Sequence, residues 1–106
     1  MAKPCPFCPM FDGATEQIVI PPLNPVVPGH LLVIPREHVT DFAENPGVTA
    51  RIMRHAAIVA RTKGGEWNLI TSKGEAATQS VFHLHVHLVP RNADDGLHLP
   101  WTRQKR

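Results

Sequence analysis

Three histidines at every second position are the clearest chemical feature of the sequence, in His83-Leu84-His85-Val86-His87. Histidine can act as a base, a nucleophile or a metal ligand near neutral pH. In a strand, successive side chains point to opposite faces, so the three imidazoles would share one face and the apolar residues between them the other. We expect the apolar face to pack in the core and the histidine face to carry the chemistry.

Two other interpretations of this strand are less favoured. A merely solvated polar face does not explain three histidines opposite an unbroken apolar face. A single metal bound by all three conflicts with the spacing of a strand, because positions two apart are separated by about 6.5 Å and positions four apart by about 13 Å, whereas a zinc–nitrogen bond is about 2 Å. Neighbours could share a metal, but His83 and His87 could not without a sharp bend. We therefore expect the three histidines to have different roles.

The only two cysteines of the chain lie close together in Cys5-Pro6-Phe7-Cys8. Such a pair can be a redox site, half of a zinc site or a chance occurrence. A redox pair of this spacing would follow a strand and precede a helix, but only four residues precede Cys5, and Pro9 follows Cys8. The pair is also a poor disulfide framework. The spacing favours a metal site that takes two further ligands from elsewhere.

Short strands and one helix must position these residues. Hydrophobic patterning predicts strands over 17–20, 30–34, 67–71 and 80–89, and a helix over 49–63 that ends at Gly64-Gly65. The last two strands have no helix between them and should pair antiparallel. The expected fold class is α+β, with a mainly antiparallel sheet and one long helix. We expect a single domain over 1–106, with a metal-binding segment at 1–13 and a tail at 92–106.

Composition excludes several classes of protein. A chain of 106 residues has room for one core. The net charge is only +2, and the small basic cluster of Arg103, Lys105 and Arg106 is typical of a solvated terminus, so no direct nucleic-acid binding is expected. No apolar run is long enough to span a bilayer, and the first residues lack the apolar run of a secretory signal. We expect no membrane association and a cytoplasmic location.

Two segments in order resemble the histidine triad (HIT) family. They are Pro28-Gly29-His30-Leu31-Leu32-Val33-Ile34-Pro35 and Gln79-Ser80-Val81-Phe82-His83-Leu84-His85-Val86-His87-Leu88-Val89-Pro90-Arg91. The resemblance extends from about Ile18 to Arg91. It implies the HIT-like fold and a nucleotide hydrolase or nucleotidyl transferase that acts at the α-phosphate, on a nucleoside phosphoramidate or a dinucleoside polyphosphate. In this family the middle histidine, here His85, attacks the phosphorus and forms a covalent nucleotidyl-histidine intermediate.

The resemblance also implies roles for other residues. His87 and Ser80, with the neighbouring Gln79, are expected at the phosphate, and His30 is a second catalytic candidate from the adjacent strand. The nucleophile needs a neutral imidazole with one nitrogen free and the other donating to a fixed acceptor, which a backbone carbonyl can supply. Family members often form homodimers, and we expect one here.

A zinc-bearing branch of the family supplies a ligand set for the cysteine pair. The resemblance places those ligands at a CxxC near the N-terminus, at the histidine that closes the Ile-Pro-x-x-His segment, and at the first histidine of the triad. The implied ligands of a structural zinc are Cys5, Cys8, His38 and His83.

Two positions depart from the family pattern. Many members carry an acidic residue for the ribose hydroxyls where this chain has Pro22, and Asn24 is the nearby polar residue that could replace it. Relatives often place Asn or Gln near Ser72 to contact the phosphate or the leaving group, and Ser72 could equally be an ordinary loop hydroxyl. These departures keep two alternatives open, namely a nucleotide-binding module with little turnover and a zinc-stabilised interaction protein.

Overall fold

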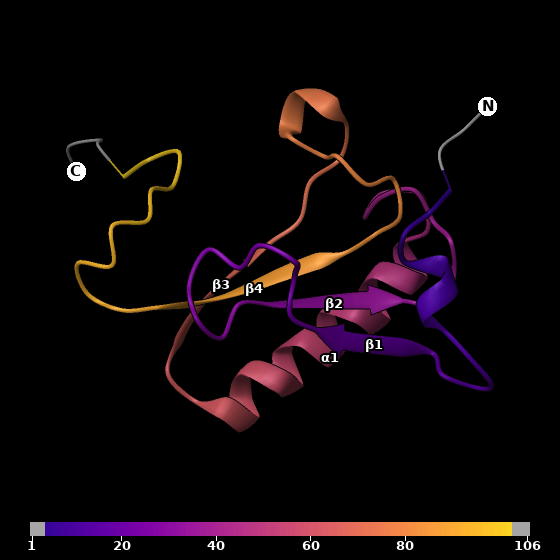
Figure 1. The fold of residues 1–106 in the computed structure, drawn as a ribbon, viewed down its shortest axis with the longest axis horizontal. Coiled ribbons are helices and arrows are strands. Elements are labelled where there is room, and N and C mark those ends of the chain that lie inside the picture. The colour runs from indigo at the N-terminus through magenta and orange to yellow at the C-terminus, as the bar shows by residue number, and fades with distance from the viewer. Residues whose placement is uncertain (1–3, 103–106) are drawn as a thin grey trace.

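The computed structural model describes residues 4–102, in which four strands and one long helix form an α+β domain. The sheet is antiparallel with the order β1-β2-β4-β3. Helix α1 crosses behind the sheet, and the loop between β1 and β2 passes in front of it (Figure 1). The predicted fold class is confirmed. In chain order the elements are the 3₁₀ helix η1 (Cys8–Met10), β1 (Gln17–Ile20), β2 (Leu31–Pro35), α1 (Pro46–Lys63), β3 (Glu66–Ile70), the 3₁₀ helix η2 (Glu75–Ala77) and β4 (Val86–Arg91).

Helix α1 begins at Pro46, earlier than the expected residue 49, because Asn45 caps it. The Asn45 side-chain oxygen accepts hydrogen bonds from the N–H groups of Gly47 at 3.1 Å and Val48 at 3.3 Å. Proline suits the first position of a helix, where its missing N–H would have no partner. Gly64 ends the helix with a φ of 70°, a conformation that glycine adopts without strain.

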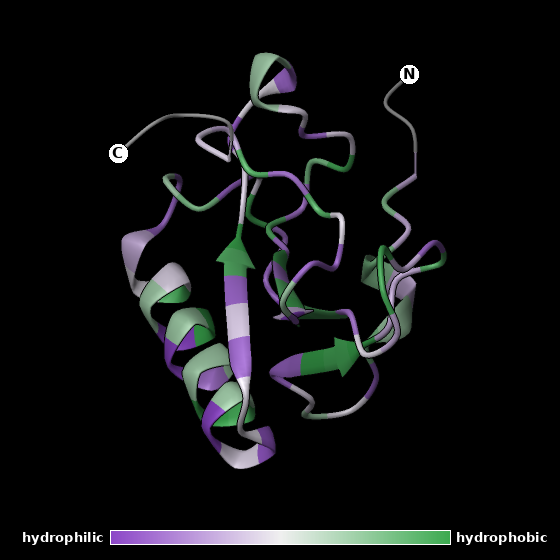
Figure 2. Cartoon of the chain, turned by 90° about the vertical axis from the view of Figure 1, so that its left-hand side faces the viewer, coloured by the Kyte–Doolittle hydropathy of each residue, from purple (hydrophilic) through white to green (hydrophobic). Residues whose placement is uncertain are grey.

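The two faces of the sheet bury different clusters. The face toward α1 packs against one stripe of the helix, and Figure 2 shows hydrophobic and hydrophilic bands alternating along α1. The opposite face packs against the N-terminal segment. The buried residues of the first cluster are Val33, Val39, Val48, Ile52, Ala56, Leu84, Val86 and Leu88, and those of the second are Phe7, Leu32 and Ile34. The sheet therefore lies between α1 and the cysteine-bearing segment.

The predicted strand over 80–89 was wrong in its first half, because β4 begins only at Val86. Val86 pairs with Val33 of β2, so a longer ladder would place Leu84 opposite Pro35, which has no N–H to donate. The Leu84 N–H instead donates to the Val39 carbonyl at 2.8 Å. Of the three histidines only His87 lies in the strand, so simple alternation does not describe the other two.

The other predicted boundaries are close to those observed. The first strand was predicted with its observed bounds, and β2 and β3 each differ from the prediction by one residue at either end. The basic residues Arg103, Lys105 and Arg106 lie outside the described residues. Within residues 4–102, no helix combines the length and the apolar character that crossing a membrane requires.

Candidate functional site

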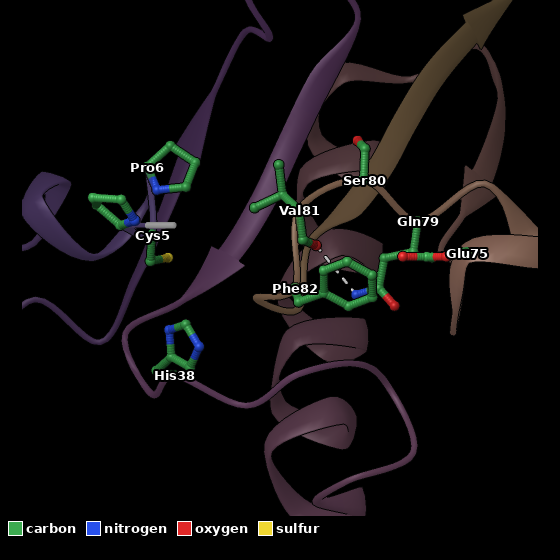
Figure 3. Close-up of a pocket in the computed structure, with 9 residues that line it drawn as sticks. Cys5, Pro6, His38, Glu75, Gln79, Ser80, Val81 and Phe82 are labelled. Carbon is green, nitrogen blue, oxygen red and sulfur yellow. Dashed lines mark hydrogen bonds between the residues drawn. The ribbon is translucent and has the colours of Figure 1, made fainter. Parts of the chain in front are cut away.

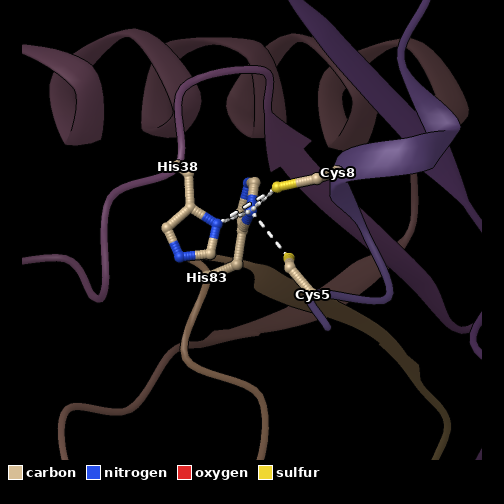
Figure 4. Close-up of side chains that lie close together, drawn as sticks. All are labelled: Cys5, Cys8, His38 and His83. Atoms are coloured by element: carbon tan, nitrogen blue, oxygen red, sulfur yellow. Dashed lines mark hydrogen bonds between the residues drawn. The ribbon is translucent and has the colours of Figure 1, made fainter. Parts of the chain in front are cut away.

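Four side chains from distant parts of the chain converge on one point beside β2. Cys5 Sγ lies 3.3 Å from His83 Nδ1, and Cys8 Sγ lies 3.1 Å from His38 Nδ1. The two Nδ1 atoms are 3.2 Å apart, and all four ligand atoms lie within 4.8 Å of one another (Figure 4). A tetrahedral zinc site with two sulfur and two nitrogen ligands has edges of about 3.3 to 3.8 Å. The predicted ligand set is therefore assembled and could bind a metal ion.

The surroundings of His83 fit a metal ligand. Its ring is fully buried, and Nε2 lies 2.8 Å from the Pro35 carbonyl oxygen. A carbonyl only accepts, so Nε2 carries the proton, and the neutral ring presents the Nδ1 lone pair to the cysteines. Metal-bound histidines are usually oriented in this way by a second hydrogen bond. Two thiols and two imidazoles are a donor set that zinc favours.

His85 is oriented by the backbone of the same segment. Its Nδ1 donates to the His83 carbonyl at 2.8 Å, which leaves Nε2 of the neutral ring unprotonated. The carbonyl of His85 in turn accepts from the Thr71 hydroxyl at 2.8 Å. The structure thus shows the arrangement that a nucleophilic histidine needs, a free nitrogen on one side of the ring and a fixed acceptor on the other.

His30 and His87 form a hydrogen-bonded chain that fixes both tautomers. The Val26 N–H donates to His30 Nδ1 at 3.1 Å, so the proton of the neutral His30 ring lies on Nε2. His30 Nε2 is 3.0 Å from His87 Nδ1 and donates to it. His87 therefore carries its own proton on Nε2. Because a backbone N–H begins the chain, every donor in it has a defined direction.

Burial keeps both rings of this pair neutral. Desolvation, together with the nearby His85 and His30 rings, lowers the pKa of His87 to about 4. Desolvation also lowers the pKa of His30, whose side chain is almost fully enclosed. Near pH 7 the pair therefore holds the single-proton tautomers that the hydrogen bonds require, and His87 offers its Nε2–H as a donor.

A cavity of about 280 Å³ opens in front of His30 and His87. One wall is the sheet face that carries His87, and the other is the loop after β1 together with the segment that follows β4. Arg91 lies at its edge and is held by Asp95, with bonds of 2.7 Å from Nε and 2.9 Å from Nη2. Most of the lining is apolar. The lining residues are Val26, His30, Asn68, Ile70, His87, Val89, Arg91, Leu97, His98 and Leu99.

A second hollow, of about 690 Å³, lies beside the cysteine cluster, between the N-terminal segment and the loop before β4 (Figure 3). Ser80 and Gln79 line it and do not line the cavity of His87. The Gln79 amide is occupied by the protein. It donates to the carbonyls of Thr40 at 2.7 Å and Val81 at 3.2 Å, and it accepts from the Gly74 N–H at 2.8 Å. Gln79 therefore holds the loop, whereas Ser80 is exposed.

The remaining two predicted substrate residues are not brought to the histidines in the same way. Asn24 is exposed in the loop between β1 and β2, and Ser72 is half-buried after β3. Neither is among the residues that line the two cavities. Of the predicted site residues, the structure brings together His30, His87 and His85, whose ring centroid is 5.3 Å from that of His87, and the four cysteine and histidine ligands with one another.

The family model of the HIT domain matches residues 15–94 of the chain. The chain belongs to the HIT family. Its four-stranded antiparallel sheet and single long helix are those of solved HIT structures. A HIT family hydrolase from Clostridium thermocellum is 31% identical, with a TM-score of 0.73 over 93% of this chain and 99% of that one.

Two relatives match most of this HIT domain. Adenylylsulfatase HINT3 of Arabidopsis thaliana is 32% identical over 108 residues, which cover 88% of this chain and 55% of HINT3. The HIT domain thus spans about half the length of that relative. Protein hit of Bacillus subtilis is 31% identical over 116 residues, covering 94% of this chain and 80% of the relative. A nucleotide hydrolase or transferase type of function is supported at this level.

Sequence patterns missed several residues of the HIT site. The Val26 N–H and the His83 carbonyl are backbone groups, which every residue has, so no residue type could mark them. Phe7 packs against His85, and its place between two cysteines was the available signal. Asn68 faces the His87 cavity, and a polar residue between Trp67 and Leu69 could have indicated it.

Proposed function

We propose that this HIT domain hydrolyses or transfers the nucleotidyl group of a nucleotide phosphate through a covalent intermediate on His85. The observation that carries the proposal is the bond from His85 Nδ1 to the His83 carbonyl, because it leaves the Nε2 lone pair free. His85 Nε2 attacks the α-phosphorus, a phosphorus–nitrogen bond forms, and the bond to the leaving group breaks. Water or another acceptor then attacks the phosphorus and releases His85, and the proton that the acceptor loses to solvent balances the proton that the leaving group takes up.

His87 is proposed as the hydrogen-bond donor to the phosphoryl oxygen and to the leaving-group atom. The chain from Val26 through His30 places its proton on Nε2, and the lowered pKa keeps the ring neutral near pH 7, with this N–H as its donor. His87 lines the cavity of about 280 Å³, whereas His85 does not. Because the leaving group departs opposite the attacking nitrogen and is stabilised by a hydrogen-bond donor beside it, we assign this cavity to the leaving group.

The chemistry of the cavity limits the leaving group. Its only arginine is neutralised by Asp95, and half of its lining residues are aliphatic. Such a site favours a small or apolar leaving group, such as the amine of a nucleoside phosphoramidate, over a second nucleotide with its own phosphates. The name of the HINT3 relative adds adenylyl sulfate, whose leaving group is also small, to the substrates worth testing.

Proposed substrate contacts follow from the positions of the predicted residues. The exposed hydroxyl of Ser80 is assigned to a phosphoryl oxygen, and Gln79 supports that loop through its three backbone partners. Asn24 lies in the loop that carries Val26 and is assigned to the ribose. Ser72 follows Thr71, which contacts the His85 carbonyl, and is assigned to the leaving-group side.

We also propose that Cys5, Cys8, His38 and His83 hold a structural zinc ion. The ion would tie the N-terminal segment to the loops that follow β2 and precede β4, and its binding energy would add to folding stability. Metal analysis of protein purified without added zinc should show about one zinc per chain. Cys5→Ser should lose it, and equal near-zero content in both proteins contradicts the assignment.

Turnover of a substrate panel tests the proposed reaction. The panel contains adenosine and guanosine phosphoramidates, a dinucleoside polyphosphate and adenylyl sulfate, each with the parent protein and with His85→Ala. The parent should turn over at least one member, and His85→Ala should abolish it. Rapid quenching with a substrate labelled at the α-phosphate should trap label on the parent chain only. Unchanged turnover in His85→Ala removes His85 as nucleophile, and binding without turnover in the parent indicates a binding module.

A further inference from the structure

Phe7 contacts both the cysteine and histidine cluster and the nucleophile. It lies between the two cysteines in sequence, and only 8% of it is exposed. Its ring centroid is 5.8 Å from that of His83, with the ring planes perpendicular, and 5.2 Å from that of His85, with an interplanar angle of 64°. Both are edge-to-face contacts of the kind that aromatic rings prefer. One side chain therefore joins the two sites.

The position of the Phe7 ring depends on its neighbours in the chain. Cys5 and Cys8 are drawn toward the two histidines of the cluster, at 3.3 Å from His83 Nδ1 and 3.1 Å from His38 Nδ1. A residue held from both sides in this way has little freedom to move its backbone. Below the ring, Leu32 and Ile34 of β2 complete its packing. Cys5 and Cys8, which we call the cysteine clasp, thus hold the backbone of Phe7 so that its ring contacts His85.

The hydrogen bond of His85 does not fix its ring completely. The bond from Nδ1 to the His83 carbonyl selects the tautomer, but the ring can still rock about that bond. The ring of His85 contacts two other aromatic rings. These are the ring of Phe7 and the ring of His87, whose centroid is 5.3 Å away. Phe7 is an apolar contact that limits this rocking, and rate is sensitive to small errors in the direction of attack.

Phe11 provides a matched comparison in the same segment. It also packs against the buried cluster, and its ring stacks on that of His83 at 6.4 Å with an interplanar angle of 7°. The aromatic contacts of the structure include none between Phe11 and His85 among residues 4–102. The two phenylalanines therefore share the metal-ligand neighbour and differ in contact with the nucleophile.

We propose that Phe7 is a positioning residue for His85 and that the cysteine clasp sets its place. A metal ion bound by the clasp then affects the orientation of the nucleophile as well as the stability of the fold. The inference rests on the proposed role of His85. Phe7 would then affect the reaction through His85, without contacting the substrate itself.

Activity measurements on Phe7→Leu, Phe7→Tyr and Phe11→Leu test this inference. Phe7→Leu should lower kcat about tenfold with KM changed less than twofold, because orientation is lost and substrate contacts remain. Phe7→Tyr keeps a ring and should recover most of kcat. Phe11→Leu should resemble the parent. Zinc content and melting temperature are measured for each protein, so a loss caused by unfolding or by an emptied metal site is recognised.

Nuclear magnetic resonance gives a readout that does not depend on turnover. The ring protons of His85, assigned by their absence in His85→Ala, should shift in Phe7→Leu because they lose the ring current of Phe7. They should stay in place in Phe11→Leu, and a chelator added to the parent should move them as Phe7→Leu does.

The outcomes separate this inference from the proposed function. A parent with turnover whose kcat is unchanged in Phe7→Leu, or equally lowered in Phe11→Leu, overturns the positioning role alone. His85 signals that do not respond to the chelator overturn the dependence on the clasp. A parent without any turnover overturns the proposed function and the positioning role of Phe7 in catalysis with it, while the His85 signals still decide whether the cysteine pair sets the orientation of the ring.

Discussion

Mild acid should destabilise the protein through His87. Its pKa in the folded protein is about 4, against an ordinary value of 6.5, because burial and the nearby rings of His85 and His30 disfavour the charged form. As the pH falls below 6.5, the unfolded chain takes up a proton at this position and the folded protein does not. Stability is therefore lost between about pH 6.5 and pH 4, and this contribution is constant above and below that window.

The size of the effect follows from the same two values. A tenfold change in acid strength corresponds to about 1.4 kcal/mol, so the free energy of unfolding should fall by about 2 kcal/mol between pH 7 and pH 5 from His87 alone. His30 should add to this loss, because its pKa is lowered as well. The pKa of His83 is lowered by burial as well, so the contribution of His87 must be measured as a difference between two proteins.

His87→Asn is the suitable variant, because its side-chain oxygen can still accept the hydrogen bond from His30 Nε2. Urea unfolding at a series of pH values, with the slope m compared between the two proteins, gives the free energy of unfolding. The parent should lose about 2 kcal/mol more than His87→Asn between pH 7 and pH 5. His98→Asn controls for the loss of a histidine at an exposed position. Parallel curves for the parent and His87→Asn would refute the reasoning.

Three further predictions concern the cap, the clasp and the tail. Asn45→Ala removes the acceptor for two helical N–H groups and should lower the free energy of unfolding by about 1 kcal/mol, measured in urea; an unchanged midpoint would contradict the cap. A chelator should lower the melting temperature of the parent and leave that of Cys8→Ser almost unaffected, and equal responses would argue against a bound metal at the clasp. Asp95→Asn weakens the hold on Arg91 and should speed trypsin cleavage after Arg91, with Asp94→Asn as control, and equal cleavage of the two variants would show that Asp95 does not anchor the tail.

Local patterns were sufficient for most of the fold. The first strand consists of Gln17 and three β-branched residues and is followed by Pro21-Pro22. It was predicted with its observed bounds. The start of α1 was placed too late, although the capping residue Asn45 and Pro46 were both visible in the sequence. The error at 80–85 had a different origin, because the missing N–H of Pro35 acts on a segment far away in the chain. Homodimerisation and a cytoplasmic location stay predictions.

The sequence by itself determined which residues could do chemistry. The histidine pattern and the cysteine pair carry the family resemblance, and that resemblance predicted the role of His85 and the ligand set, because a family signature depends on residue types at fixed spacings. Tertiary structure decided how each imidazole is used. The His83 carbonyl accepts from Nδ1 of His85, the Val26 N–H directs the proton of His87 through His30, and the ring of Phe7 contacts that of His85. Tautomer and orientation depend on backbone groups and on packing across the sheet, and both exist only once the chain has folded.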